Sequence, residues 1–522
     1  MSIGHGLPYI DHYDEPDTVN RALRILTTGD FNPHWFGYPT VTIYLEAIVY
    51  VPVFVLLAAK GYAQGLSDIQ YFDFFTHKGT WQWYINYSQF YLYGRLLVVL
   101  FGVATDLLVY FAAKKAFGDK KTALLAALFS ACSYGMLFQS VHILPNIPVT
   151  FFITASALTS LYIAEPSPNG VSLRKLYLLN GFLIGLAAAT KYNSFPVLIP
   201  FILAHLYRTR SLRLNRDIVL GLAFVFVGFL AGAPYSILDL PAFLNGLALV
   251  IKDYSQGRLN RAYTFSENLT NLNNYLQYYA FMYFFSILGM GLPILLAIAG
   301  SVQSAYKKNR KAIILLSFAV PYTLYMGSQK LFWPDGRNHV QVLPFIAVFA
   351  AYSMVSAIRW GLARNSRAAV HAFAIAAILI IAVFFRPVTM LAQDSYKRYG
   401  AIDTRVQAAE WVARELPPGS RLLVESNLNL MAEHFADDGL VVGEVDSFKE
   451  PDRLTDCEYF ITGDFRFTDP WRTTAYTDVT LGRFKLIKEF SGSHINVEEL
   501  PRPISDFNGP PCIRIYMRTQ AG

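Results

Sequence analysis

Long apolar runs separated by short polar segments fill the chain between residues 94 and 386. We count about ten runs, several of them shorter than the roughly 20 residues that a straight crossing of a bilayer needs. They cover residues 94–117, 122–139, 147–164, 176–190, 194–207, 217–237, 278–301, 312–327, 339–358 and 368–385. This pattern predicts a polytopic α-helical membrane protein whose membrane domain occupies residues 94–386.

The charge of the loops predicts their orientation, because loops with an excess of Lys and Arg stay on the cytoplasmic side. One set of alternate loops holds most of the basic residues, among them Lys114, Arg174, Arg210, Lys307 and Arg364. The other set includes the segments before residue 94 and after residue 386, which are therefore expected to be extracytoplasmic.

The segment Pro39–Lys60 is long enough to cross the membrane, but it contains Glu46 and Pro52. The sequence that follows, Tyr71–Tyr93, is rich in Tyr, Phe and Trp, as segments at the membrane surface are. We therefore expect interfacial or re-entrant helices within a first extracytoplasmic loop over residues 1–93. A true span would instead place everything before it on the cytoplasmic side.

Near residue 394 the long apolar runs end and the sequence becomes mixed apolar and polar. An amphipathic helix over Arg405–Leu416 is followed by strand-like runs at residues 421–425, 459–462, 484–489 and 512–518. This alternation predicts a small extracytoplasmic α/β domain over residues 394–522. The domain has neither a Gly-rich phosphate loop nor a Ser/His/Asp motif, so we expect the chemistry to lie elsewhere.

Composition supports the membrane assignment, because 54% of the 522 residues are hydrophobic and only 16% are charged, against roughly 25% charged in soluble proteins. The net charge of +7 then reflects membrane topology, and no nucleic-acid partner is expected. The three cysteines lack the paired spacing of a zinc site. Cys132 is expected in the helical core, and a disulfide between Cys457 and Cys512 stays open.

The adjacent carboxylates Asp14 and Glu15 are the first candidates for chemistry. Ionised groups beside a membrane domain often serve catalysis or transport, and two neighbouring carboxylates can divide proton acceptance and the positioning of a hydroxyl. The alternative is structural, because acidic residues also favour the first turn of a helix, here one over Thr18–Leu26. No cofactor is certain, and a divalent cation held by this pair is a further alternative.

Lys191 interrupts an apolar stretch, Leu176–Tyr207, that is too long for one crossing and short for two. A cation at that depth is costly unless it meets an anion such as a lipid phosphate. The structural alternative is that the side chain reaches towards the lipid headgroups.

Three further basic residues stand where apolar runs begin, namely Arg95, Arg337 and His339. They could supply phosphate-binding charge together with Lys191. Arg337 could equally form a surface ion pair with Asp335, and Arg95 could simply anchor its helix.

The order of these motifs resembles a known family. The Asp-Glu pair is followed by Gly37-Tyr38-Pro39, by Gly94-Arg95-Leu96-Leu97, by Gly-Leu-Ala-Ala-Ala-Thr-Lys-Tyr at residues 185–192, by Arg337–Pro344 and by a soluble tail. This arrangement, over nearly the whole chain, resembles the GT-C membrane glycosyltransferases of the protein mannosyltransferase and aminoarabinose-transferase type, the bacterial family 39 relatives.

The chain departs from that family in two places. Relatives usually begin with a membrane helix before the Asp-Glu loop, whereas polar sequence follows Met1 here, so we expect an upstream helix to be missing or removed. Asn146 stands where relatives commonly carry an acidic residue. This substitution weakens any scheme with two carboxylates from separate loops, including a metal site.

The resemblance implies a polyprenyl-phosphate-linked sugar donor and a catalytic carboxylate at Asp14, with Glu15 beside it. Donor-phosphate binding is then expected of four basic residues: Lys191, Arg337, His339 and Arg95. Four residues of the outer loops are expected to form the acceptor and sugar pocket: His34, Tyr38, His142 and Asn146.

The resulting hypothesis is transfer of a monosaccharide from a polyprenyl-phosphate carrier to an acceptor hydroxyl on a lipid, glycan or protein. It places a multi-pass, monomeric enzyme in the cell (inner) membrane, with the donor and membrane lipids as partners and the reaction on the extracytoplasmic face. A lipid-linked saccharide transporter is the alternative, although transporters usually show internal repeats. An inactive scaffold with the GT-C fold is another.

Overall fold

The computed structural model of the chain describes most of the helical region and the cores of the remaining elements. The described residues are 3–4, 6–10, 12, 14–79, 84–165, 172–211, 213–256, 266–267, 269–270, 292–327, 336–363, 371, 374, 402–425, 428, 435, 439–445, 451–463, 484–491 and 512–519. They divide into two compact units. We call residues 21–62 and 93–391 the helical unit, and residues 1–20, 63–92 and 392–522 the mixed unit.

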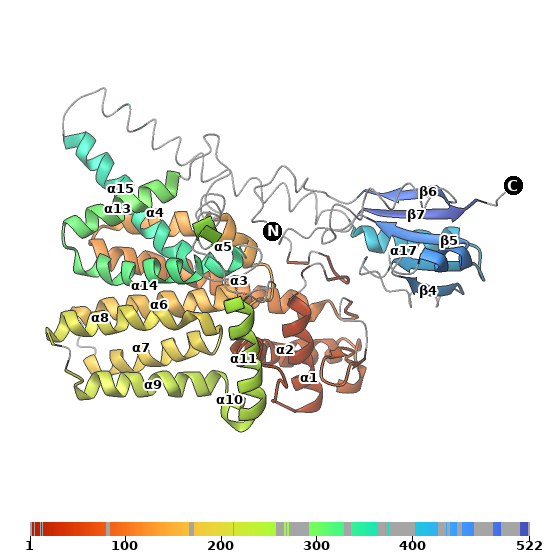
Figure 1. Ribbon diagram of the computed structural model, residues 1–522, viewed down its shortest axis with the longest axis horizontal. Coiled ribbons are helices and arrows are strands. Elements are labelled where there is room, and N and C mark those ends of the chain that lie inside the picture. The colour runs from red at the N-terminus through yellow and green to blue at the C-terminus, as the bar shows by residue number, and fades with distance from the viewer. Residues whose placement is uncertain are drawn as a thin grey trace. The chain divides into compact units, whose positions relative to one another are not determined.

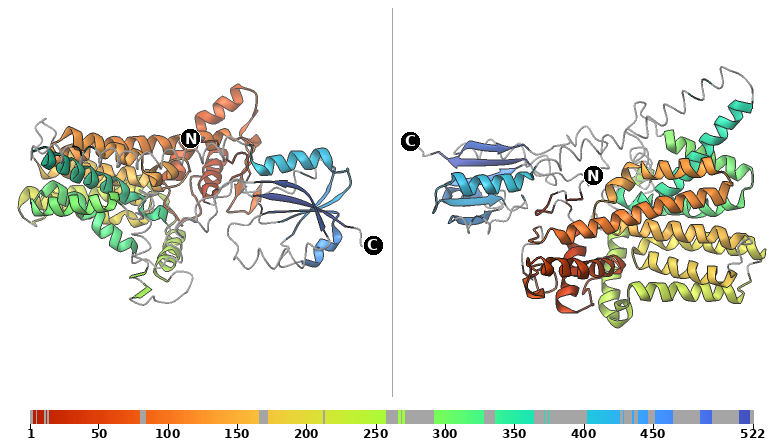
Figure 2. Two further views of the ribbon diagram at one scale, coloured as in Figure 1. Left: turned by 90° about the horizontal axis from the view of Figure 1, so that it is seen from above. Right: turned by 180° about the vertical axis from the view of Figure 1, so that it is seen from behind.

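The helical unit is a bundle whose long helices run side by side (Figures 1 and 2). Its long helices are α3 (Gln89–Phe117), α4 (Lys120–Ala131), α6 (Asn146–Ala164), α7 (Leu173–Ala188), α8 (Leu198–Thr209), α9 (Arg216–Gly232), α13 (Leu292–Tyr306), α14 (Arg310–Gly327) and α15 (Leu343–Ala363). Shorter pieces join them: α5 (Tyr134–Gln139), α10 (Tyr235–Leu238), α11 (Leu240–Gln256) and the 3₁₀ segments η2 (Tyr192–Val197) and η4 (Gly336–Val342).

These helices confirm the predicted polytopic helical architecture. Each apolar run within the described residues coincides with a helix or with a short helix joined to a longer one. Residues 278–291 of one run, and the run at 368–385 apart from residues 371 and 374, lie outside the described residues. Four helices of the described residues are long and apolar enough to cross a membrane alone: residues 41–59, 89–117, 146–164 and 337–363. The run at 122–139 is not one helix, because Cys132 and Ser133 interrupt the helical conformation between α4 and α5.

Close backbone contact between α7 and α9 depends on small residues. A side chain at Gly181 would collide with the carbonyl of Gly221, and one at Gly228 would collide with that of Phe182. Small residues allow helices to approach closely where the surrounding lipid supplies no hydrophobic driving force. This packing fixes where α7 ends, and Lys191 follows shortly after that end.

Ion pairs connect the basic loops at one end of the bundle. Glu165, just after α6, accepts from Lys311 at 2.7 Å and from Lys115 at 3.2 Å. Arg359 of α15 pairs with Asp119 at 2.6 Å. Burial raises the pKa of Glu165, but the two lysines outweigh it and hold that pKa below its usual value. The loops predicted to share one side of the membrane therefore do lie together.

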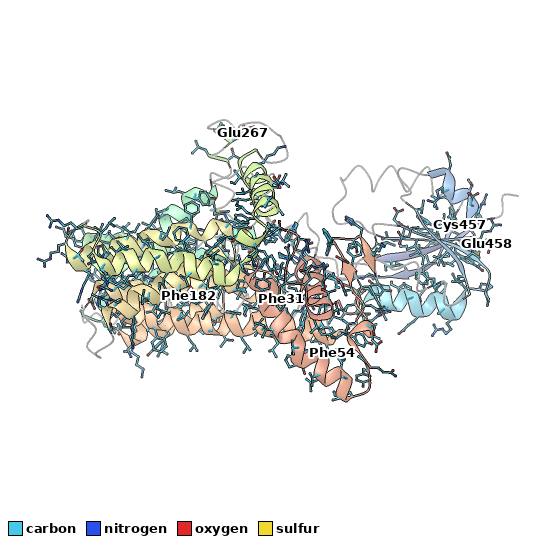
Figure 3. The ribbon with its side chains drawn as sticks, turned by 90° about the horizontal axis from the view of Figure 1, so that it is seen from below. Phe31, Phe54, Phe182, Glu267, Cys457 and Glu458 are labelled. Carbon is cyan, nitrogen blue, oxygen red and sulfur yellow. The ribbon has the colours of Figure 1, made fainter. Side chains whose placement is uncertain are left out.

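Helix α2 (Val41–Ala59) is one continuous helix, not the pair of helices that we expected. It runs obliquely to the parallel helices of the bundle, as the helix that carries Phe54 shows in Figure 3. The chain leaves the mixed unit at Asn20 and returns to it at Ala63. A single crossing by α2 would put residues 1–20 and 63–92, which cluster in one unit, on opposite sides of the membrane; the interfacial placement of α2 stays a prediction.

The mixed unit is built on a five-stranded sheet in the order β4-β3-β5-β7-β6. Its strands are β3 (Arg421–Glu425), β4 (Val441–Val445), β5 (Tyr459–Gly463), β6 (Phe484–Phe490) and β7 (Ile513–Arg518), with α17 (Thr404–Glu415) packed on one face. Alternate residues face the two sides: Val424 joins the core shared with α17, and Leu423 joins a smaller core on the other face. The predicted C-terminal α/β domain is therefore present.

The leader and the loop before α3 belong to this same unit. A short hairpin of β1 (Phe72–Asp73) and β2 (Lys78–Gly79), the 3₁₀ segments η1 (Leu66–Asp68) and η6 (Pro451–Asp456), and the start of α1 (Glu15–Thr28) complete it. Arg405 binds Asp403 through two hydrogen bonds of 2.9 Å, donates to the carbonyl of Ile10 and lies over the ring of Tyr9. These boundaries differ from the predicted domains, because residues 21–62 join the bundle.

Strand pairing places the two cysteines of the sheet far apart. Cys512 precedes β7 beside Gly463, whereas Cys457 precedes β5, which is antiparallel to β7. A rise of about 3.4 Å per residue separates them by roughly 20 Å along the strands, beyond the reach of a disulfide. Neither thiol forms a disulfide in the structure, and both are buried.

Cysteine labelling tests whether α2 leaves its two flanks on one side. We expect Thr28→Cys, before α2, and Glu458→Cys, in the mixed unit, to react with an impermeant thiol reagent from the same side of sealed vesicles. The unmodified chain is the control, since its three cysteines are buried and should stay unlabelled. Reaction of the two variants from opposite sides would mean that α2 crosses the membrane.

Candidate active site

The ammonium of Lys191 is the centre of a buried polar cluster in the helical unit. Its Nζ donates to Oδ1 of Asn146 at 2.6 Å and to Oδ1 of Asn338 at 2.5 Å. All three side chains are at least 96% buried. The amide oxygens solvate the ammonium without neutralising its charge, so the cluster retains the capacity to bind an anion.

The three residues come from three places where the chain starts a helix. Asn146 is the first residue of α6, Lys191 caps the start of η2, which leads into α8, and Asn338 lies within η4, which leads into α15. The unsatisfied N–H groups at a helix start carry partial positive charge. The sequence therefore brings three such helix starts together around one lysine.

A further layer of hydrogen bonds orients the amides. Asn146 donates to Oε1 of Gln139 at 2.9 Å, and Tyr322 donates from its hydroxyl to the carbonyl of Asn338 at 2.9 Å. The ring of His142 donates from Nδ1 to the carbonyl of Phe138 at 2.9 Å. His142 is thus buried close to Asn146 in the same loop.

The other basic residues predicted to bind phosphate occupy different positions. Arg337 and His339 flank Asn338 on η4, with Arg337 partly exposed and His339 buried. Arg95 is fully buried near the start of α3. A side chain at the neighbouring Gly94 would collide with the carboxylate of Glu46, so α2 packs tightly against this part of α3. The fold brings Arg337 and His339 next to the lysine cluster in sequence and space.

Asp14 and Glu15 stand at the start of α1 in the mixed unit. Glu15 is the first helical residue and is fully buried, whereas Asp14 is partly exposed. The backbone N–H of Asp14 donates to Nδ1 of His12 at 3.2 Å. Their position at a helix start matches the capping alternative, and a helix start also lowers the cost of keeping a carboxylate ionised for catalysis.

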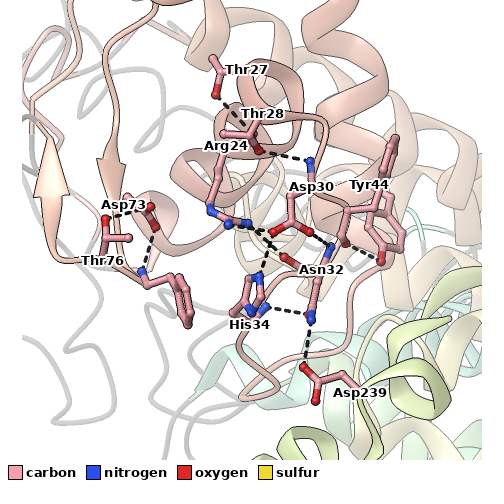
Figure 4. Close-up of polar contacts among 12 residues, drawn as sticks. Arg24, Thr27, Thr28, Asp30, Asn32, His34, Tyr44, Asp73, Thr76 and Asp239 are labelled. Carbon is pink, nitrogen blue, oxygen red and sulfur yellow. Dashed lines mark hydrogen bonds and ion pairs between the residues drawn. The ribbon is translucent and has the colours of Figure 1, made fainter.

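His34 takes part in an ion-pair network in the first loop (Figure 4). Oδ2 of Asp30 accepts from Arg24 at 2.8 Å and from Nε2 of His34 at 2.9 Å, and Asn32 connects this pair to Asp239 after α10. Burial raises the pKa of Asp30, but the hydrogen bonds from His34, Asn32 and Arg24 lower it to about 2. His34 therefore has a structural partner, and its role in a sugar pocket stays a prediction.

Tyr38 lies in the same loop, which packs on the lysine end of the bundle. Its ring meets that of Trp35 edge-on at 5.5 Å, and the hydroxyl of Tyr192, the residue after Lys191, donates to the carbonyl of Phe36 at 3.2 Å. The backbone N–H of Val41 donates to Ala189 at 3.1 Å. These bonds place the first loop beside the segment that carries Lys191.

Within the described part of the chain, no group of three or more His, Cys, Asp and Glu residues could hold a metal ion. A cation at Asp14 and Glu15 stays an alternative for that pair alone. The sequence reasoning missed Asn338, Gln139 and Tyr322. Asn338 carried a signal, because it is an amide at the start of an apolar run, next to two residues that were selected.

The comparisons with known proteins agree with the predicted resemblance. Residues 39–237 match the model of the dolichyl-phosphate-mannose-protein mannosyltransferase family. No curated protein matches the chain.

Solved structures extend the similarity beyond the matched segment. The structure of ArnT from Cupriavidus metallidurans bound to undecaprenyl phosphate is similar with a TM-score of 0.51 and 13% identity, over 98% of this chain and 95% of that chain. The Archaeoglobus fulgidus oligosaccharyltransferase in complex with Zn and sulfate gives 0.49 and 14%, over 87% and 64%. The fold is that of the GT-C membrane glycosyltransferases, and the predicted resemblance to this class is confirmed.

The network around Asp30 predicts a pH dependence of stability. Because the pKa of Asp30 falls from 3.8 to about 2 on folding, its contribution is present above about pH 4 and is lost as the pH falls towards 2. We expect Asp30→Asn to lower the melting temperature at pH 7 and to reduce its fall between pH 5 and 3.

The matched control is Glu410→Gln on the exposed face of α17, which should leave both quantities unchanged. An Asp30→Asn protein with the wild-type melting curve at both pH values would show that the network does not stabilise the fold.

Proposed function

We propose that this chain transfers a monosaccharide from a polyprenyl-phosphate carrier to an acceptor hydroxyl on the extracytoplasmic face of the cell membrane. The observation that carries the proposal is the buried ammonium of Lys191, which the amides of Asn146 and Asn338 hold at three converging helix starts. Ammonium groups and helix starts both bind phosphate. The matched mannosyltransferase model and the undecaprenyl phosphate bound to ArnT point to the same chemistry.

The reaction divides between a leaving group and a nucleophile. The acceptor oxygen attacks the anomeric carbon, and the bond from that carbon to the phosphate oxygen breaks, so its electron pair leaves with the polyprenyl phosphate. Lys191 and Arg337 offset the charge that develops there. Asp14 accepts the proton of the acceptor hydroxyl and Glu15 positions that hydroxyl. A single displacement of this kind inverts the anomeric centre.

Radiolabelled polyprenyl-phosphate sugars in reconstituted membranes test the proposal. Label that reaches an acceptor supports it. Label that crosses the membrane unchanged would identify a transporter, and label that does neither would identify an inactive scaffold.

Loss of either phosphate-binding cation should weaken donor binding. We expect Lys191→Met and Arg337→Ala each to raise the dissociation constant for undecaprenyl phosphate about tenfold to a hundredfold, because a charge-assisted hydrogen bond contributes about 1.5–3 kcal/mol. Binding is measured by titration of the purified protein. Lys307→Met is the control, since this exposed lysine donates to Tyr352. Unchanged affinity in both test variants would show that Lys191 and Arg337 do not bind the phosphate and only anchor their helices.

Asp14→Asn separates catalysis from helix capping. The substitution keeps size and polarity but removes the proton acceptor, so turnover should fall roughly 10²–10⁴-fold while donor binding stays the same. Glu15→Gln should be milder, because Glu15 only positions the hydroxyl.

Asn caps a helix about as well as Asp. A folded Asp14→Asn enzyme with wild-type turnover would therefore exclude the catalytic role and leave capping as the function of Asp14.

A further inference from the structure

Gln341 is a buried amide with no use in the fold described so far. It lies in η4 with none of its surface exposed, and neither its Nε2 nor its Oε1 has a hydrogen-bond partner among the described residues. An unsatisfied buried polar group is unfavourable, and the partner that satisfies such a group is often a ligand or an ordered water.

The geometry of η4 places Gln341 beside the lysine cluster. Residues three apart in a 3₁₀ segment eclipse one another, one turn or about 6 Å along the axis. Gln341 therefore shares a face with Asn338, whose Oδ1 accepts from Lys191. Gln341 lies one turn of η4 beyond Asn338 on the same face of that segment.

Two more buried polar atoms without a partner belong to residues that follow Lys191 closely in sequence. Oδ1 of Asn193 and Oγ of Ser194 are buried without a hydrogen-bond partner in the part of the chain that the structure describes. Both residues belong to η2, directly after Lys191. Asn180 of α7 shows the contrast, because its amide accepts from Ser156 at 2.6 Å and donates to Ser160 at 2.8 Å. Buried amides elsewhere in the bundle thus have partners.

We propose that Gln341 hydrogen-bonds the hydroxyl on carbon 2 of the donor sugar. This inference rests on the proposed function and specifies its substrate class as sugars with a hydrogen-bonding group at that position. A hydroxyl both donates and accepts, as does the primary amide. Carbon 2 adjoins the anomeric carbon, so its hydroxyl lies within a few ångströms of the phosphate. This spacing matches one turn of η4, which separates Gln341 from Asn338 and its partner Lys191.

The proposal predicts discrimination against donors that lack this hydroxyl. A 2-deoxy donor leaves the amide unsatisfied, and one such hydrogen bond corresponds to a loss of about tenfold to a hundredfold in kcat/KM. Oγ of Ser194 and Oδ1 of Asn193 could bind other polar groups of the same sugar.

The test compares wild type and Gln341→Met on two donors. The first donor is the one that wild type uses fastest among undecaprenyl-phosphate hexoses and pentoses, and the second is its 2-deoxy analogue. Wild type should prefer the first about tenfold to a hundredfold in kcat/KM, and Gln341→Met should reduce that preference to nearly one. An unchanged preference in the variant, or none in wild type, would overturn the inference. Wild type that uses no donor would overturn the proposed function itself.

Thermal unfolding and a matched amide keep this test independent of folding. Gln341→Met should leave the melting temperature of the unliganded protein unchanged or higher, because it removes an unsatisfied group. Asn180→Leu should lower the melting temperature, since it strands Ser156 and Ser160, yet keep the wild-type preference between donors. A fall in melting temperature for Gln341→Met as large as that for Asn180→Leu would show that the amide serves the fold, and would overturn the inference.

Discussion

The alignment of three helix starts in the helical unit depends on the buried ammonium of Lys191. Lys191 joins α6, which starts 45 residues earlier at Asn146, to η4, where Asn338 lies 147 residues later. Removing an ammonium from water is costly unless polar groups replace the water. The chain meets that requirement only if the starts of these helices converge, so the solvation of a single side chain constrains how the helices of the bundle align.

The two acceptors that the structure describes for the Lys191 ammonium are amides, which solvate its charge as this requirement demands. An aspartate at position 146 would neutralise the ammonium, whereas the asparagine solvates it and leaves its charge available to a phosphate. Asn146 therefore fits the proposed anion site at Lys191 better than a two-loop metal site. The opposite end of the bundle uses carboxylates, and there Glu165 and Asp119 pair fully with basic residues.

Much of the fold followed from the hydrophobic pattern. Apolar runs predicted the helices, because burial in lipid demands a continuous apolar surface and internal backbone hydrogen bonds. Lys191 could be found because a charge within an apolar stretch is costly unless a polar partner or a ligand compensates it. Asn338 and Gln341 were missed because an uncharged amide needs no counter-ion and so does not by itself indicate an anion site. The assignment of residues 21–62 to the bundle could not be read from sequence either, since it rests on contacts such as that between Val41 and Ala189.

The contact between Arg405 and Ile10 has a consequence for biosynthesis. The two residues are 395 positions apart, and translation at about 5–20 residues per second separates their synthesis by roughly 20–80 s. During that interval Tyr9, which ends in the core shared with α17 and the sheet, can contact Tyr84 but not the residues of α17 and the sheet. The leader that carries Asp14 is made first, but its contacts with α17 and the sheet form only when the last domain folds. A ribosome-bound chain truncated before residue 405 would therefore carry a complete lysine cluster but a leader that lacks these contacts.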